Sequence, residues 1–209
     1  MKSLTYLGHS CFCLEAENGW RVVFDPYQNG SVPGLELPAL SADVVLCSHG
    51  HADHNASDLI QIEPVHTSPY TITTMETDHD DQGGSLRGKS NVTILSNAEE
   101  KIIHLGDLGR DLTDEEAAQL LDADLLMIPC GGFYTIDAAQ AGAIIKQLHP
   151  ELAVLMHYRT DEHGYEVIEH LSAIIEVLPE TRILETSVLE GNKEQGIVAL
   201  TADRSVIHS

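Results

Sequence analysis

The chain has 209 residues, with 11 Lys and Arg against 33 Asp and Glu, which gives a formal charge of −22. An apolar fraction of 43% and a charged fraction of 21% are those of a globular protein and exclude wholesale disorder. The acidity argues against a nucleic-acid partner, because duplex binding draws on clusters of Lys and Arg. It favours neutral or cationic small molecules, unless metal ions held by some of the 12 histidines reverse the field locally.

The start of the chain has no apolar stretch of signal-peptide length before His9 and Ser10. No window reaches the roughly 18 uninterrupted apolar residues of a transmembrane helix. We therefore expect a cytoplasmic protein with no membrane partner, built as a single domain over residues 1–209. The sequence leaves open whether the chain forms a homo-oligomer. The four cysteines are expected to be reduced, buried side chains rather than disulfides: Cys11, Cys13, Cys47 and Cys130.

The first half of the chain is rich in predicted strands. Short apolar runs at residues 4–7, 11–16 and 21–25 favour strands, and Asn18-Gly19 between the last two predicts a hairpin. A Gly- and Pro-rich loop follows, and residues 43–48 then read as a strand buried on both faces. Three further strands are predicted, at residues 71–77, 91–96 and 101–105.

The second half alternates helices with buried strands. Thr113 and Glu116 predict a capping box, and Asp137 predicts the cap of a second helix that ends before Pro150. A third helix is expected over residues 167–178. Strands are expected at residues 125–129, 153–156, 181–186 and 196–200. The pattern predicts an α/β fold with strands of mixed direction.

The most informative segment is residues 48–55, Ser-His-Gly-His-Ala-Asp-His-Asn, directly after a predicted strand. It places three imidazoles and one carboxylate in six consecutive positions: His49, His51, Asp53 and His54. Zinc and similar divalent ions bind these donors at about 2.0–2.2 Å. His49 and His51, two apart on an extended segment, can point the same way. Asp53 and His54 can face a second position, so one cluster could serve two metals.

Further ligand types follow other predicted strands. Asp107 comes after residues 101–105 in a turn with two glycines, and His157 comes after residues 153–156. Ligands in open α/β sheets gather at the carboxyl ends of strands, so these groups are expected to converge on one sheet edge. His79, on a loop between strands, could complete the ligands of His49 and His51. The remaining histidines except His9 are treated as structural or surface residues: His66, His104, His149, His163, His170 and His208.

The run His49-x-His51-x-Asp53-His54, with Asp107 and His157 in order behind it, resembles the metallo-β-lactamase superfamily. Residues 8–12, 25–27 and 156–158 are similar to its branch related to ascorbate-6-phosphate lactonase. Together the motifs span most of the chain. The resemblance implies an αββα sandwich of two mixed β-sheets flanked by helices, with the metal site at one sheet edge.

The resemblance also implies a distribution of ligands. The first metal would be held by His49, His51 and His79, and the second by Asp53, His54 and His157, with Asp107 as the bridge. Asp25 matches a family aspartate that braces the histidine loop. The chain departs from the family where His79 is followed by residues 80–84, Asp-Asp-Gln-Gly-Gly, in place of Thr-Pro-Gly. This departure disfavours the antibiotic- and thioester-hydrolysing subgroups.

The sequence thus predicts a metal-dependent hydrolase in which a metal-bound hydroxide attacks an ester-like bond, a lactone or a phosphodiester, of a small molecule. Two divalent ions are expected, with zinc the first choice and manganese or iron as alternatives. Asp53 is expected to orient the water and receive a proton. His9 and Tyr158, and more weakly Tyr134, are candidates to assist the developing anion or leaving group.

Two other classes of function stay open. One is iron-dependent oxygen or persulfide chemistry on the same scaffold, since imidazole and carboxylate ligands also suit iron. The other is a metal- or metabolite-binding protein without turnover. The sequence does not specify the substrate, the physiological metal, the oligomeric state, the general acid or whether the source is salt-adapted.

Overall fold

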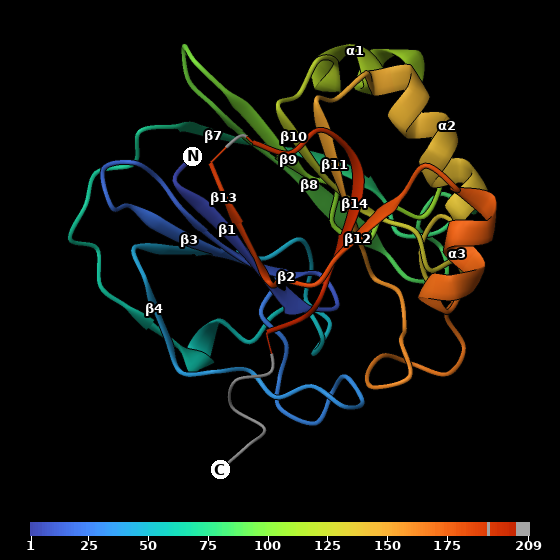
Figure 1. The fold of residues 1–209 in the computed structure, drawn as a ribbon, viewed down its shortest axis with the longest axis horizontal. Coiled ribbons are helices and arrows are strands. Elements are labelled where there is room, and N and C mark those ends of the chain that lie inside the picture. The colour runs from blue at the N-terminus through green and yellow to red at the C-terminus, as the bar shows by residue number, and fades with distance from the viewer. Residues whose placement is uncertain (192, 204–209) are drawn as a thin grey trace.

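Two β-sheets form the centre of the computed structural model, which describes residues 1–191 and 193–203 (Figure 1). The first sheet has five strands in the spatial order β13 (Val188–Glu190), β1 (Ser3–Gly8), β2 (Cys11–Glu15), β3 (Arg21–Phe24) and β5 (Val44–Leu46). The second has seven, in the order β12 (Arg182–Leu184), β14 (Gly196–Leu200), β11 (Leu152–Met156), β10 (Leu125–Pro129), β9 (Lys101–His104), β8 (Lys89–Ser96) and β7 (Thr71–Asp78). Two short strands that the sequence did not predict, β4 (Leu40–Ala42) and β6 (Ile60–Ile62), pair separately.

Both sheets contain parallel and antiparallel pairs. In the first sheet β1, β2 and β3 are antiparallel neighbours, and β5 lies parallel to β3. In the second sheet the five neighbouring strands β12, β14, β11, β10 and β9 are parallel to one another. Strand β8 is antiparallel to its two neighbours, β9 and β7. The predicted hairpin is present, and Ala16 N donates to Trp20 O across it. These mixed sheets match the α/β prediction.

The helices α1 (Asp114–Leu120), α2 (Ala138–Leu148) and α3 (Leu171–Val177) lie on the side of the seven-stranded sheet that faces away from the first sheet (Figure 1). Strands β10 and β11 are therefore covered on both faces, which explains why every residue in them is apolar and buried. A single apolar core joins the two sheets. No described helix has the length and apolar character needed to cross a membrane.

Two element predictions need correction. Residues 44–46 are only half-buried, because β5 is the edge strand of the first sheet rather than a central one. The third helix starts at Leu171, where the His170 side chain accepts from Ser172 N. Val167, expected in the helix core, lies before the helix with 52% of its surface exposed. The capping box of α1 and the Asp137 cap of α2 are as predicted, and the four cysteines form no disulfide.

Candidate metal centre

Strand direction brings the candidate residues to one edge of the sandwich. In the five-stranded sheet β1, β3 and β5 run in the same direction, and their C-terminal ends lead into His9, Asp25 and the histidine loop (residues 48–55). In the seven-stranded sheet β7, β9 and β11 share a direction, and they lead into His79, Asp107 and His157. The predicted convergence at carboxyl ends of strands therefore involves three strands of the same direction from each sheet.

A first group of histidines consists of His49, His51 and His79, whose nearest ring nitrogens lie within 4.8 Å of one another. His49 Nε2 is 3.0 Å from His51 Nδ1, and the rings of His49 and His79 are 4.7 Å apart. His51 is exposed, whereas His79 retains only 2% of its surface. The loop after β7 thus brings His79 to the two histidines with which the resemblance grouped it.

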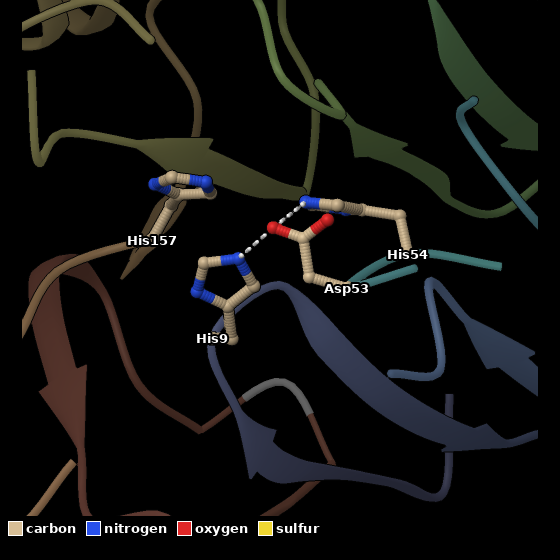
Figure 2. Close-up of side chains that lie close together, drawn as sticks. All are labelled: His9, Asp53, His54 and His157. Atoms are coloured by element: carbon tan, nitrogen blue, oxygen red, sulfur yellow. Dashed lines mark hydrogen bonds and ion pairs between the residues drawn. The ribbon is translucent and has the colours of Figure 1, made fainter. Parts of the chain in front are cut away.

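A second group consists of Asp53, His54 and His157 together with His9, which point toward one another in Figure 2. Asp53 Oδ2 lies 3.3 Å from His9 Nε2 and 3.7 Å from His54 Nε2. The rings of His9 and His157 are 4.1 Å apart. Because His9, His54 and His157 have no exposed surface, this group is closed by protein on most sides.

Asp107 lies between the two groups. Its Oδ2 is 3.2 Å from His54 Nε2 and 3.3 Å from His157 Nε2 in the second group. The same oxygen is 3.4 Å from His79 Nε2 and 3.9 Å from His49 Nε2 in the first. One carboxylate oxygen therefore faces imidazoles of both groups, as a bridging ligand would.

The turn that carries Asp107 depends on a glycine. Gly106 has φ +55°, and a Cβ there would lie 2.7 Å from the Ser48 side chain of the histidine loop. Asp107 N donates to Ser90 Oγ at 3.0 Å, which fixes the turn on the other side. A larger residue at position 106 would push Asp107 away from the histidine loop.

Several buried polar atoms in both groups have no hydrogen-bond partner among the described residues: His9 Nδ1, His54 Nε2, His79 Nδ1, Asp107 Oδ1, and His157 Nδ1 and Nε2. Buried polar groups are otherwise almost always paired, so this concentration needs a physical reason. Imidazole nitrogens and carboxylate oxygens around a shared point are the donor set of a borderline divalent ion. The residues present therefore fit bound metal.

Metal binding requires neutral imidazoles and ionised carboxylates, and the groups of this site differ in how far they meet that requirement. For His54, burial acts to lower the pKa, but the Asp107 and Asp25 carboxylates outweigh it and hold the pKa well above its ordinary value, so a metal ion must displace a proton there. Burial lowers the pKa of His49 to about 4, despite the nearby Asp107 carboxylate. Burial likewise lowers the pKa of His9 to about 3. For Asp107, burial acts to raise the pKa, but the charges of His157 and His54 outweigh it and hold the pKa well below its ordinary value.

Asp25 supports the histidine loop from behind, in the place that the resemblance implied. Its Oδ1 accepts from Ser48 N at 2.6 Å, and its Oδ2 accepts from Ser48 Oγ at 2.6 Å. The same Oδ2 is 2.8 Å from His54 Nδ1. Because His54 Nδ1 donates its hydrogen bond to Asp25, Nε2 is the ring nitrogen that faces the site.

The backbone is strained at this edge. His9, Asp25 and His157 have φ values of +56°, +41° and +57°, in the left-handed region that non-glycine residues rarely adopt. His157 N donates to His9 O at 2.9 Å and joins two of these positions. Such strain persists where the surrounding structure holds it, and it is commonly found in binding and catalytic sites.

The family model for the beta-lactamase superfamily domain matches residues 3–157, which include every residue of both groups. The chain belongs to this superfamily.

Relatives and solved structures agree with this assignment. A UPF0173 metal-dependent hydrolase from Carboxydothermus hydrogenoformans is 26% identical, over 75% of this chain and 84% of the relative. Another from Opitutus terrae is 28% identical, over 78% of this chain and 89% of the relative. A crystal structure from Thermotoga maritima, named as a Zn-dependent hydrolase of the metallo-β-lactamase superfamily, superposes with a TM-score of 0.75. It is 27% identical, and the match covers 96% of this chain and 98% of that one.

These findings confirm the superfamily, the α/β sandwich and the class of metal-dependent hydrolase that the sequence predicted. The similarity to the ascorbate-6-phosphate lactonase branch stays a prediction.

Tyr158, one of the residues that the sequence predicted to be catalytic, does not lie at the metal-binding groups. Tyr158 is fully buried, and its hydroxyl donates to Leu200 O at 3.0 Å in the core. Because β11 ends at Met156, His157 turns into the site while Tyr158 turns away from it. The structure therefore does not bring the Tyr158 hydroxyl to the metal-binding groups.

A different tyrosine, which the sequence did not single out, reaches the second group. Tyr165 OH lies 3.2 Å from Asp53 Oδ2 and is oriented to donate to it. Gly164, with φ +103°, packs against Arg159, where a Cβ would be 2.6 Å from the Arg159 Cβ. No motif surrounds Tyr165, so its place at the site becomes apparent only from the path of the loop after β11. Tyr134 lies nearby, with its ring 5.8 Å from that of Tyr165.

The other histidines take structural or peripheral places. His104 is buried, stacks on Phe24 at 5.2 Å and donates from Nε2 to Ser10 O. His66 and His170 contact Asp43 and Asp161, away from both groups. His208 lies outside the described residues.

Proposed function

We propose that the chain, as one domain over residues 1–209, hydrolyses an ester-like bond in a small molecule, a lactone or a phosphodiester. Two divalent ions, with zinc the first choice, would be held by His49, His51 and His79 and by Asp53, His54 and His157. Asp107 would contact both. The observation that carries the proposal is the position of Asp107 Oδ2 within 3.9 Å of four imidazole nitrogens drawn from both groups.

When bound, a pair of divalent ions polarises the scissile group and lowers the pKa of a water to about 7, which supplies a nucleophile at neutral pH. The protein must then orient the nucleophile, hold the substrate and place a proton donor. Asp53, His9 and Tyr165 are the side chains that the structure offers for these tasks.

Asp53 is suited to accept a hydrogen bond from the nucleophile. Burial acts to raise its pKa, but the hydrogen bond from His9 and the charge of His54 hold the pKa well below its ordinary value. His9, a neutral imidazole, donates from Nε2 to Asp53 Oδ2 and fixes the carboxylate. This assigns His9 a positioning role and Asp53 a direct one.

Tyr165 is suited to donate a proton or hydrogen bond to the developing anion. Burial and the Asp53 carboxylate hold the pKa of its phenol above its ordinary value, so the hydroxyl stays protonated at neutral pH. It is half-buried at the open side of the second group, which gives a substrate access to it. Tyr165 takes the role that the sequence analysis gave to Tyr158.

The test combines elemental analysis with a panel of lactone and phosphodiester substrates, using protein expressed with zinc, manganese or iron supplied. We expect close to two metal ions per chain and hydrolysis of at least one substrate class. Asp107→Ala should lose metal and activity together, while Asp114→Ala, an exposed carboxylate in the first turn of α1, should retain both.

Wild-type protein without stoichiometric metal after this expression would refute the proposal. An oxygen electrode in the same assay tests iron-dependent oxygen chemistry, which would consume oxygen without hydrolysis. Full metal occupancy with neither reaction would favour the binding protein without turnover.

A further inference from the structure

The ring of His79 is held differently from those of His49 and His54. His49 Nδ1 lies 2.9 Å from Ser48 Oγ, and His54 Nδ1 lies 2.8 Å from Asp25 Oδ2. His79 Nδ1, by contrast, is buried and has no hydrogen-bond partner among the described residues. Histidines that bind metal are usually oriented by a partner on the second ring nitrogen. The position of His79 must therefore be set through its neighbours in the chain.

Both neighbours of His79 are buried carboxylates that are tied down. After it, Asp80 accepts four hydrogen bonds from backbone N–H groups of its own loop, all between 2.8 and 2.9 Å. Before it, Asp78 ends β7 and contacts two cations. Asp78 Oδ1 pairs with Lys89 Nζ, and Asp78 Oδ2 accepts from Arg110 Nε at 2.7 Å. His79 thus lies between two anchored residues.

The two cations that contact Asp78 come from different parts of the fold. Lys89 begins β8 and lies directly opposite Asp78 in the β7–β8 pair, so this ion pair stays within two adjacent strands. Arg110 instead follows Asp107 by three positions and reaches Asp78 across 32 positions of the sequence. The Arg110 side chain therefore joins the loop that carries His79 to the turn that carries Asp107.

The backbones of the loop and the turn also meet, directly before Arg110. Gly109 N donates to Asp78 O at 2.9 Å. A Cβ at Gly109 would lie 2.3 Å from both His79 C and Asp80 N, so only a glycine permits this approach. Arg110 thus adds a side-chain link to a close backbone contact.

Helix α1 fixes the other side of the Arg110 guanidinium. Arg110 Nη1 donates to Glu116 Oε2 at 2.8 Å, and Nη2 donates to Oε1 at 2.7 Å. This is the paired geometry that a guanidinium forms with a carboxylate and that a lysine does not reproduce. Glu116 Oε2 also accepts from Thr113 N in the capping box of α1. One guanidinium therefore ties β7, the turn of Asp107 and α1 together.

We infer that Arg110 is a positioning residue for the first metal-binding group, because it holds the loop of His79 against the turn of Asp107. His79 Nε2 lies 3.4 Å from Asp107 Oδ2 in this arrangement. Asp107 is also fixed by Ser90 Oγ, so loss of Arg110 should displace His79 rather than the bridging carboxylate. The inference rests on the proposed two-metal site.

The sign of the effect distinguishes position from charge. Removal of a cation near a metal site makes the local field more favourable to a divalent ion, because like charges repel. Substitution of Arg110 by an uncharged residue would therefore strengthen metal binding if Arg110 acted only through its charge. Weaker binding can come only from a changed position of the ligands.

Zinc titration of the purified protein in competition with a chromophoric chelator tests the inference. It yields one dissociation constant for each group, and His51→Ala identifies the constant that belongs to the first. Arg110→Gln should raise the first-group constant roughly 10-fold, as for other residues that orient metal ligands, and leave the second within about 2-fold. Arg110→Lys keeps the charge without the paired geometry, so its first-group constant should lie between those of wild type and Arg110→Gln.

Lys89→Gln is the matched control, because it removes a cation from the same Asp78 carboxylate without touching the turn of Asp107. The Lys89 side chain is 49% exposed, so its ion pair contributes little, and both constants should stay within about 2-fold of wild type. Glu116→Gln preserves the helix cap but weakens the contact to Arg110. It should raise the first-group constant by a smaller factor, and it decides the question if Arg110→Gln does not fold.

Three results would overturn the inference. They are unchanged or tighter zinc binding by Arg110→Gln, an equal weakening of both groups, and equal effects of Arg110→Gln and Lys89→Gln. If wild type binds zinc but hydrolyses no substrate, the proposed hydrolysis fails while the titration still decides the role of Arg110. If hydrolysis is found and Arg110→Gln binds zinc as wild type does, only the inference fails.

Hydrogen exchange of the metal-free protein decides the inference if wild type binds no zinc. The Gly109 N–H, which donates to Asp78 O, should exchange roughly 10-fold faster in Arg110→Gln than in wild type and Lys89→Gln. The Leu105 N–H, which donates to Met127 O, should exchange at the same rate in all three proteins. Equal exchange of the Gly109 N–H in all three would overturn the inference.

Discussion

The two metal-binding groups contain the same kinds of donor but differ in how the protein surrounds them. In the second group His9, His54 and His157 have no exposed surface, and Asp25 fixes His54 from behind. In the first group His51 is exposed, and the Ser48 hydroxyl contacts His49. We therefore propose a division of labour, in which the second group retains a metal ion more tightly and the first group, through His51, faces solvent.

The largest expected effect comes from removing one histidine from each group. His54→Ala should reduce metal affinity of the second group and activity by more than about 100-fold, beyond the loss typical of supporting residues, because it removes a buried ligand that also contacts Asp107. His51→Ala should retain about one metal ion per chain, since the second group stays intact. Elemental analysis after dialysis against a weak chelator measures both. Equal metal content in the two variants would contradict the division of labour.

A smaller effect is expected from Asp25→Asn, which weakens the support of His54 without removing a ligand. Metal affinity or activity should fall roughly 10- to 100-fold. Asp43→Asn is the matched control, because Asp43 is also a buried carboxylate that accepts backbone hydrogen bonds, from Arg21 and His66, but does not contact the site. It should lower thermal stability and leave metal affinity unchanged. Metal titration of both variants checks the prediction, which fails if they behave alike.

Two tyrosines, Tyr165 beside the second group and Tyr158 in the core, provide a third comparison. Tyr165→Phe removes the donor to Asp53 and should lower kcat roughly 10-fold with metal content unchanged. Tyr158→Phe removes the hydrogen bond to Leu200 O in the core and should reduce the free energy of unfolding by about 1 kcal/mol without a change in kcat. Steady-state kinetics and denaturant unfolding measure the two effects. A drop in kcat for Tyr158→Phe alone would reverse the assignment.

The smallest effect concerns acid stability of the loop that follows His79. Burial acts to raise the pKa of Asp80, but hydrogen bonds from four backbone N–H groups outweigh it and lower the pKa to about 2, from an ordinary value of 3.8. The ionised Asp80 carboxylate therefore contributes its full stabilisation of the folded state when the pH is above the ordinary pKa. This stabilisation is lost as the pH falls through about 2. The difference in Tm between wild type and Asp80→Asn should therefore be largest above pH 4 and shrink toward pH 2. A difference that does not vary with pH would show that the Asp80 charge does not hold the loop.

The sequence predicted the parts of the site that follow local rules. The histidine loop stands out because four ligands occupy six positions, and Asp107 and His157 follow recognisable buried strands. The capping residues Thr113 and Asp137 begin their helices as expected. Each of these features depends on a few neighbouring residues, so a local pattern is enough to reveal it.

Features that depend on distant packing were missed or misplaced. Residues 44–46 have the composition of a central strand, yet β5 lies at a sheet edge, because only the strand order decides which faces are covered. Tyr165 lies in a loop without a motif, and only its contact to Asp53 places it at the site. A single tyrosine carries no signal in the sequence that distinguishes such a position from an ordinary surface site.

By itself, then, the sequence determined the chemical class of the site, because clustered imidazoles and carboxylates specify divalent metals through their lone pairs. The tertiary structure alone decided that His9 lies in the second group and which tyrosine faces Asp53. Those outcomes follow from the shared direction of β1, β3 and β5 in one sheet and of β7, β9 and β11 in the facing sheet. This direction brings together loops whose residues lie as much as 148 positions apart in the sequence, between His9 and His157.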